Sequence, residues 1–171
     1  MLKILATICI IGMATSSCTS KKASRTESSH EAEPELTMIV GTYTSGDSKG
    51  LYSFRFNEEN GTATALSEAE VENPSYLVPS ADGKFIYADS EFSNDQAAAN
   101  AFAFNKEEGT FRLLNTQKTE GEDPCYIITN GSNVITANYS GGSISVFPID
   151  KDGSLLPAST VVKFKGSGAD K

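Results

Sequence analysis

Histidine, cysteine and arginine are scarce in this sequence of 171 residues. It has one histidine, His30, and three cysteines, Cys9, Cys18 and Cys125. A zinc site requires several His or Cys ligands at short spacing, and no such group is present. The sequence also has no glycine-rich phosphate-binding loop of the P-loop type. We therefore expect neither a metal nor another cofactor.

Long hydrophobic runs are also missing. The apolar run Ile4–Ala14 has eleven residues, too few to cross a bilayer as a helix. Lys3 precedes it, and small residues follow it, which predicts a secretory signal peptide over residues 1–17. The next residue, Cys18, resembles the lipidated cysteine of a bacterial lipobox, although Thr15 stands where leucine is usual. We expect a lipid anchor at Cys18 and a place in the cell envelope facing the periplasm; plain secretion and an uncleaved anchor are the alternatives.

Residues 18–36 are polar and mixed in charge, so they cannot bury enough apolar surface to order themselves and are predicted to be a tether. With Cys9 removed and Cys18 lipidated, Cys125 has no partner for an intrachain disulfide. A lone cysteine on a strand is most often a small apolar residue, and we expect Cys125 to be buried.

The charge balance excludes one class of partner. The sequence has 14 Lys and Arg against 22 Asp and Glu, a net charge of −8. No cluster of basic residues follows the tether, so nucleic acid is not an expected partner. Contact with a membrane is expected only through the lipid anchor.

What the chain does contain, from residue 37 on, is a repeated phrase of alternating strands and glycine turns. It reads "LYSFRFNEENGTATAL", then "AFAFNKEEGTFRLL", then "SISVFPIDKDGSLLP". The turn glycine Gly109 follows Gly61 by 48 residues and precedes Gly153 by 44. Alternation with period two, joined by Asn-Gly or Asp-Gly turns, indicates β-hairpins.

A repeat of 44–50 residues with four short strands is typical of a β-propeller blade. We predict an all-β fold with a domain at 37–171 and blades near 37–72, 73–121 and 122–166. The first blade lacks its inner strand, because nothing strand-like precedes Met38. Three blades do not close a ring, so the propeller is expected to be incomplete. A β-sandwich is the alternative, although sandwiches seldom repeat their turns at a fixed interval.

Three phrases make the prediction more specific: "GTYTSGDSKGLYSFRFNEENG", "NPSYLVPSADGKFIYADSE" and "PCYIITNGSNVITANYSGGSISVFPIDKDGSL". They resemble the lactonase family of seven-bladed β-propellers, which includes 6-phosphogluconolactonase-like proteins. The resemblance implies hydrolysis of a sugar-derived small-molecule lactone. Departures are Ser90, where many members have Asn, and the alanines at 97–99, where many have Gly. The family continues into Arg-Gln and Pro-His-x-His segments that this sequence does not contain.

Candidate catalytic groups are few. Lactone hydrolysis needs a stabiliser for the developing oxyanion and a base that activates water. His30 falls in the tether, and Arg55 and Arg112 fall on strands predicted to be away from the ring axis. Ser75 and Cys125 start equivalent strands without a histidine partner, so neither is predicted to be a nucleophile. No catalytic residue is assigned, and we expect the 171 residues to be inactive alone.

Four residues are predicted to line the substrate mouth, because they lie at the ends of inner strands: Tyr43, Glu91, Asn138 and Tyr139. Each has a structural alternative. Glu91 is otherwise a solvated loop acid, Tyr139 a packing residue between blades, and Asn138 a residue that holds a turn. The alternative function is a non-catalytic envelope propeller that binds a glycan or a protein.

Overall fold

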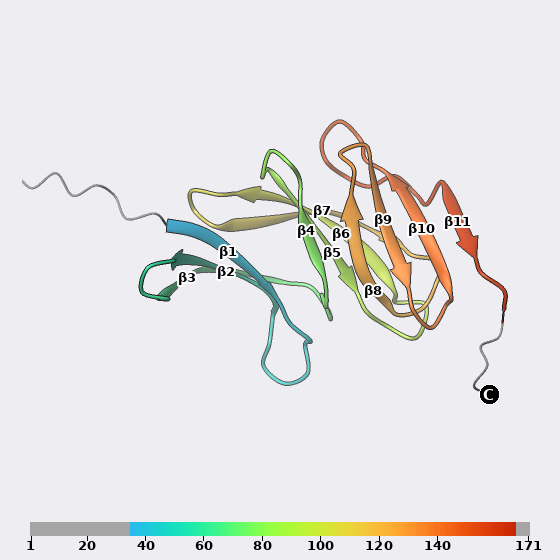
Figure 1. The fold of residues 1–171 in the computed structure, drawn as a ribbon, viewed down its shortest axis with the longest axis horizontal. Coiled ribbons are helices and arrows are strands. Elements are labelled where there is room, and N and C mark those ends of the chain that lie inside the picture. The colour runs from blue at the N-terminus through green and yellow to red at the C-terminus, as the bar shows by residue number, and fades with distance from the viewer. Residues whose placement is uncertain (1–34, 167–171) are drawn as a thin grey trace, which may run out of the picture. The chain divides into compact units, whose positions relative to one another are not determined.

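The computed structural model describes residues 35–166, which form eleven strands in three antiparallel sheets (Figure 1). The predicted signal peptide, Cys18 and nearly all of the tether lie outside these residues. Residues 35–166 form no helix of the length and apolarity that crossing a membrane requires. The prediction of an all-β, partial propeller is confirmed.

Each sheet is a meander in which successive strands pair as neighbours. The first sheet contains β1 (Glu35–Gly41), β2 (Gly50–Asn57) and β3 (Ala63–Glu70). The second contains β4 (Leu77–Pro79), β5 (Phe85–Ser90), β6 (Ala98–Asn105) and β7 (Thr110–Lys118). The third contains β8 (Pro124–Thr129), β9 (Asn133–Asn138), β10 (Ser143–Pro148) and β11 (Thr160–Lys163). Within the described range β1 pairs only with β2, so the first sheet has three strands.

Strand β5 is buried on both faces because it lies in the middle sheet of the three. Ile86 and Ala88 pack with Leu51 in the core toward the first sheet. Tyr87, which points the other way, packs with Ile127 in the core toward the third sheet. The alternation of a strand thus distributes neighbouring side chains between two separate cores.

The repeated glycine turns join each sheet to the one before it. The Gly109 carbonyl accepts hydrogen bonds from the hydroxyls of Ser53 (2.6 Å) and Ser67 (2.7 Å) on the first sheet. The Gly153 carbonyl likewise accepts from the Tyr87 hydroxyl (3.2 Å) on the second. Both glycines have positive φ angles, 71° and 87°, which residues with a side chain rarely adopt. The repeated phrase therefore serves the packing of one sheet on the next.

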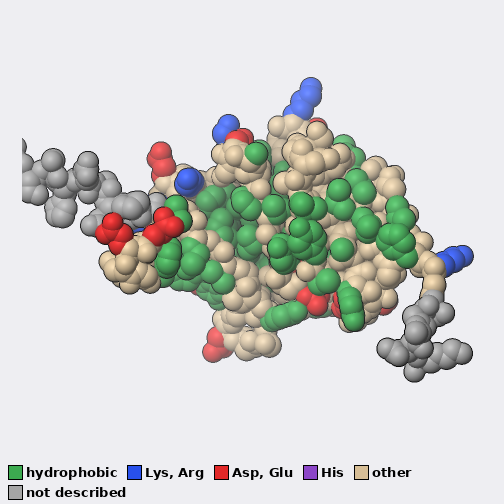
Figure 2. Space-filling view, viewed as in Figure 1, with side chains coloured by type: hydrophobic (Ala, Val, Ile, Leu, Met, Phe, Trp, Pro, Cys, Tyr) green, Lys and Arg blue, Asp and Glu red, His purple; other side chains and the backbone are tan. Residues whose placement is uncertain are grey.

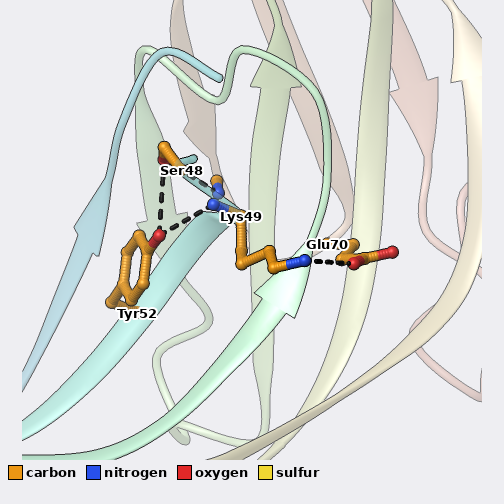
Figure 3. A network of polar contacts seen from close by, with 5 residues as sticks. Ser48, Lys49, Tyr52 and Glu70 are labelled. Carbon is orange, nitrogen blue, oxygen red and sulfur yellow. Dashed lines mark hydrogen bonds and ion pairs between the residues drawn. The ribbon is translucent and has the colours of Figure 1, made fainter. Parts of the chain in front are cut away.

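A small polar network braces the ends of β2 and β3 (Figure 3). Lys49 Nζ lies 2.9 Å from Glu70 Oε1, and the Lys49 amide donates to the Tyr52 hydroxyl (2.7 Å). The Tyr52 hydroxyl in turn lies 3.4 Å from the Ser48 hydroxyl. The Lys49 and Glu70 side chains are exposed, so the ion pair contributes little to stability.

Candidate functional site

Five residues from the first two sheets meet where β1 ends, β4 begins and β5 ends. We call Tyr43, Asn73, Ser75, Asp89 and Glu91 the mouth cluster. Two of them, Tyr43 and Glu91, are among the residues predicted from the sequence. The other three come into contact with this pair only through the fold.

Tyr43 and Glu91 form the exposed part of the mouth cluster. The Tyr43 hydroxyl donates a hydrogen bond of 2.7 Å to Glu91 Oε2, although the residues are 48 positions apart. This hydrogen bond is the main cause that raises the pKa of Tyr43, followed by partial burial and the charge of Glu91. Tyr43 therefore remains a phenol that offers a proton, and Glu91 is an acceptor held beside it.

Asn73 connects this pair to the chain around it. Its Oδ1 accepts from the Thr44 amide (3.1 Å) and the Thr44 hydroxyl (3.0 Å), just after Tyr43. Its backbone carbonyl accepts from the Glu91 amide (3.0 Å). Asn73 has φ 47°, a conformation that Asn tolerates better than most residues. One side chain thus fixes the first sheet's loop against the end of β5.

The third sheet has an equivalent connection at Asp123, which also precedes a proline and has φ 51°. Its carboxylate accepts from the Ser93 hydroxyl (2.7 Å), and its carbonyl from the Tyr139 amide (2.8 Å). Bonds from Ser140 and Ser93 hold the pKa of Asp123 below its usual value. Asn73 and Asp123, the residues before Pro74 and Pro124, therefore link neighbouring sheets in the same way.

Asp89 is the buried member of the mouth cluster, and sequence reasoning missed it. Its side chain is 0% exposed, and Oδ1 accepts from the Tyr76 amide (2.9 Å) and the Ser75 hydroxyl (3.3 Å). Burial raises its pKa to about 7; the bonds from Tyr76 and Ser75 act the other way, and the charge of Glu91 adds to the rise. The available signal was an acid inside an otherwise apolar strand, "FIYADS".

Asn138 does not line the mouth. Its side chain is 2% exposed, and its Nδ2 donates to Ser143 and Ser145, both at 3.0 Å. Its Oδ1 accepts from the Thr136 hydroxyl (3.0 Å). These hydrogen bonds hold the side chain of Asn138 inside the third sheet. Tyr139, in contrast, is 80% exposed.

The expectation that Cys125 is buried is wrong: the thiol is free and exposed. The pairing of β8 with β9 shifts register between Pro124 and Tyr126, so alternation does not determine which way Cys125 faces. Desolvation, followed by the negative charges of Glu91 and Asp89, raises the pKa of its thiol. Cys125 therefore lies within electrostatic range of the mouth cluster.

Two further exposed tyrosines lie beside the cluster: the Tyr76 amide donates to Asp89, and the ring of Tyr126 contacts that of Tyr76. The rings of Tyr76 and Tyr126 lie 4.8 Å apart between centroids, tilted by 50°, and both are partly exposed. Figure 2 shows hydrophobic side chains gathered over the part of this face where β4 and β8 lie in Figure 1. With Tyr43 and Tyr139 they present ring faces and hydroxyls, which suit the apolar faces and hydroxyl groups of a sugar derivative.

A groove of about 460 Å³ lies elsewhere, at the opposite end of β5. Its lining is mainly apolar and includes Ile39, Leu77, Ile86 and Phe104. Asp82 and Lys106 also line the groove, but Asp82 is paired with the exposed Lys84, so we do not place the chemistry there. Within residues 35–166 no group of three His, Cys, Asp or Glu side chains is arranged to hold a metal ion.

Three sheets of this kind, repeated around an inner mouth, define a β-propeller. Residues 37–171 match the family described as "Lactonase, 7-bladed beta-propeller". The chain belongs to this family, as the sequence resemblance predicted.

Relatives carry lactonase names. The 6-phosphogluconolactonase of Bacillus subtilis (strain 168) is 36% identical over 135 residues, which are 75% of this chain and 38% of that protein. A similar relative from Formosa agariphila, also called 6-phosphogluconolactonase, is 32% identical over 78% of this chain and 39% of its own length. This chain thus spans less than two-fifths of these relatives.

Solved structures agree. A Bacteroides fragilis protein provisionally assigned as a 6-phosphogluconolactonase is 72% identical, with a TM-score of 0.79 over 80% of this chain and 38% of that one. The periplasmic gluconolactonase of Pseudomonas aeruginosa is 29% identical, with a TM-score of 0.70 over 75% of this chain and 39% of that one.

Proposed function

We propose that this chain is part of a propeller that hydrolyses a sugar-derived lactone, and that Tyr43 and Glu91 line its substrate mouth, with Tyr139 nearby. The observation that carries the proposal is membership of the lactonase family over residues 37–171. The location is supported by the exposed Tyr43–Glu91 pair, which offers a phenol and a carboxylate at one point.

The residues of the mouth cluster suit binding better than the whole reaction. Glu91 can accept a hydrogen bond from a substrate hydroxyl or from water, and Tyr43 can orient that carboxylate. An oxyanion needs a positive or hydrogen-bond-donating partner worth roughly 3–4 kcal/mol. The mouth cluster contains no Arg, Lys or His, and the hydroxyl of Tyr43 is already bonded to Glu91. We infer that the oxyanion stabiliser and the base come from other blades of a complete ring.

The 171-residue chain should therefore hydrolyse no lactone by itself. The test is a pH-stat assay of δ-gluconolactone, with and without a 6-phosphate, on this chain and on the longest polypeptide that its gene encodes. We expect activity only from the longer chain. Hydrolysis by the short chain that is lost in Glu91→Gln would contradict the assignment of catalytic groups to other blades.

A glycan-binding function is the second candidate, and the observation that favours it is the exposure of Tyr43, Tyr76, Tyr126 and Tyr139, from 42% to 80%. Exposed aromatic rings can stack on sugar faces without any catalysis. Absence of hydrolysis by the longer chain, together with retention on a glycan array that is lost in Tyr76→Ala, would favour this function over the lactonase.

We also propose an envelope location with a lipid on Cys18, which lies outside the described residues. Likeness to a periplasmic gluconolactonase supports an envelope location only. Cells fed a radioactive fatty acid should label the wild-type protein and not Cys18→Ser. Equal labelling of the two proteins would contradict a lipid on Cys18, and plain secretion or an uncleaved anchor would remain as the alternatives.

A further inference from the structure

The unpaired oxygen of Asp89 is the feature of the mouth cluster that its hydrogen bonds do not explain. Oδ1 has two donors, whereas Oδ2 is buried and has no hydrogen-bond partner within the described part of the chain. A buried carboxylate oxygen without a donor is costly, because the charge has lost its hydration. Holding a proton removes the charge and most of that cost.

Asp89 is also connected to the exposed pair. The Ser75 hydroxyl lies within hydrogen-bonding reach of Asp89 and of Tyr43, and the Tyr43 hydroxyl is bonded to Glu91. The order is therefore Asp89, Ser75, Tyr43, Glu91, from the buried end to the exposed end. With Asp89 ionised, Ser75 donates to it and no hydrogen is left for the contact between Ser75 and Tyr43. With a proton on Asp89 Oδ1, each group can donate to the next, from Asp89 to Ser75, then to Tyr43 and Glu91.

The two carboxyl groups also act on each other. Asp89 lies in β5, Glu91 follows the last residue of that strand, and the charge of Glu91 raises the pKa of Asp89. Like charges held close together disfavour double ionisation. The exposed carboxyl can be hydrated and the buried one cannot, so burial decides which of the two keeps a proton. The titratable groups around Asp89 are Glu91, Tyr43 on the loop after β1, and Cys125 on β8.

We propose that Asp89 is a positioning residue of the mouth: it keeps a proton on its carboxyl below neutral pH, leaves the single negative charge to Glu91, and fixes Glu91 through Ser75 and Tyr43. The role in catalysis rests on the proposed lactonase function. The charge distribution does not, and can be measured without substrate.

This charge state suits lactone hydrolysis. Water attacks the carbonyl carbon, a new C–O bond forms, and the ring C–O bond breaks. One proton of the water reaches the ring alkoxide, and the other leaves as the product acid ionises. A mouth with one negative charge accepts a neutral lactone more readily than one that carries a 6-phosphate, and it repels the product carboxylate. Ionisation of Asp89 above neutral pH would add a second charge and disturb the position of Glu91.

The thiol of Cys125 provides a test that needs no substrate, because the two acids act on it. Iodoacetamide labelling of the full chain, followed at the Cys125 peptide by mass spectrometry, should show an inflection near pH 7 beside that of the thiol itself. In Asp89→Asn we expect this inflection to vanish and labelling above pH 7 to be about threefold faster, because loss of the negative charge of Asp89 lowers the pKa of the thiol. Asp95→Asn is the matched control and should label like wild type, because that exposed acid pairs with Lys118.

A direct measurement protects the proposal if Asp89→Asn does not fold. The side-chain ¹³C resonance of Asp89 in the wild-type protein should titrate near neutrality. Titration of Asp89 near pH 4, or a Cys125 profile without the inflection near pH 7, would overturn the proposal.

Kinetics of a lactone-hydrolysing longer chain give the final readout. We expect KM of the wild type to rise above pH 7, and KM of Asp89→Asn to stay flat over the same pH range. Equal pH profiles would overturn the positioning role. If the longer chain hydrolyses no lactone, the proposed function is wrong. The thiol and ¹³C titrations would still show whether Asp89 carries a proton.

Discussion

Asp89 shows at the scale of one residue how burial turns an ordinary acid into a pH-sensitive group. Its pKa is about 7 in the fold and near 4 in an unfolded chain, so the folded state holds the proton more tightly. The stability that this gives is fully present below about pH 4 and is lost as the pH rises through about 7.

Asp89→Asn should remove this dependence. We expect wild type to lose roughly 2–4 kcal/mol of unfolding free energy between pH 4 and pH 8 from this group, and the variant to be the more stable of the two at pH 8. Urea unfolding at several pH values measures it. A pH dependence shared by both proteins would mean that Asp89 is ionised throughout.

Tyr87 makes a second prediction at this scale. Its buried hydroxyl donates to the Gly153 carbonyl on the next sheet. Tyr87→Phe leaves that carbonyl without this donor and should cost about 1–2 kcal/mol. Tyr139→Phe, at a side chain 80% exposed, is the control and should change stability by less than about 0.5 kcal/mol. Equal melting temperatures for the two variants would argue against a role for this bond in joining the sheets.

At the scale of the elements, the hairpin turns differ in what they touch although their sequences are alike. Gly61 and Gly109 have φ of 73° and 71°, and each amide donates to an Asn carbonyl four residues earlier. A Cβ on Gly61 would meet open space, whereas one on Gly109 would lie 2.6 Å from the Leu66 side chain and 2.8 Å from Ser53 Oγ. The glycine of this turn thus faces open space in the first sheet and packs against the neighbouring sheet in the second.

Alanine at these two glycines should separate backbone strain from packing. Gly61→Ala should cost about 1 kcal/mol, from the left-handed backbone alone. Gly109→Ala carries the same strain and a clash, and should cost about 2–4 kcal/mol. Thermal unfolding of both variants makes the comparison. If both lose the same amount, the contact between the Gly109 turn and the first sheet does not contribute to stability.

At the scale of the whole molecule, the edge strands of the sheets determine which backbone amides open to solvent. Within the described residues β1 has a neighbour on one side only, whereas β9 has neighbours on both. Amides of β1 that face away from β2 should therefore exchange with solvent faster than those of β9, by tenfold or more if opening differs by about 1.4 kcal/mol. Hydrogen exchange followed by mass spectrometry measures it. Uniform protection of β1 and β9 would indicate that another segment covers the β1 edge.

The sequence alone determined the strands, the turns and the family. These depend on local chemistry: alternation places side chains on two faces, and Gly61, Gly109 and Gly153 supply the positive φ that their turns need. The repeat then followed from counting. The three-stranded first sheet was predicted from the lack of a strand-like segment before Met38, but β1 begins at Glu35, inside the predicted tether, because Glu35–Thr37 pair with β2.

Only the tertiary structure decided which polar residues meet. Tyr43 and Glu91 were both candidates, but their contact spans 48 residues and depends on how two sheets pack. Asn138 stood at the matching strand end, yet neighbouring hydroxyls hold it inside its sheet. Cys125 is exposed because of a shift in strand register, and Asp89 is buried because sheets cover β5 on both faces. Burial and long-range contact are properties of the packed molecule, and no local pattern of residues specifies them.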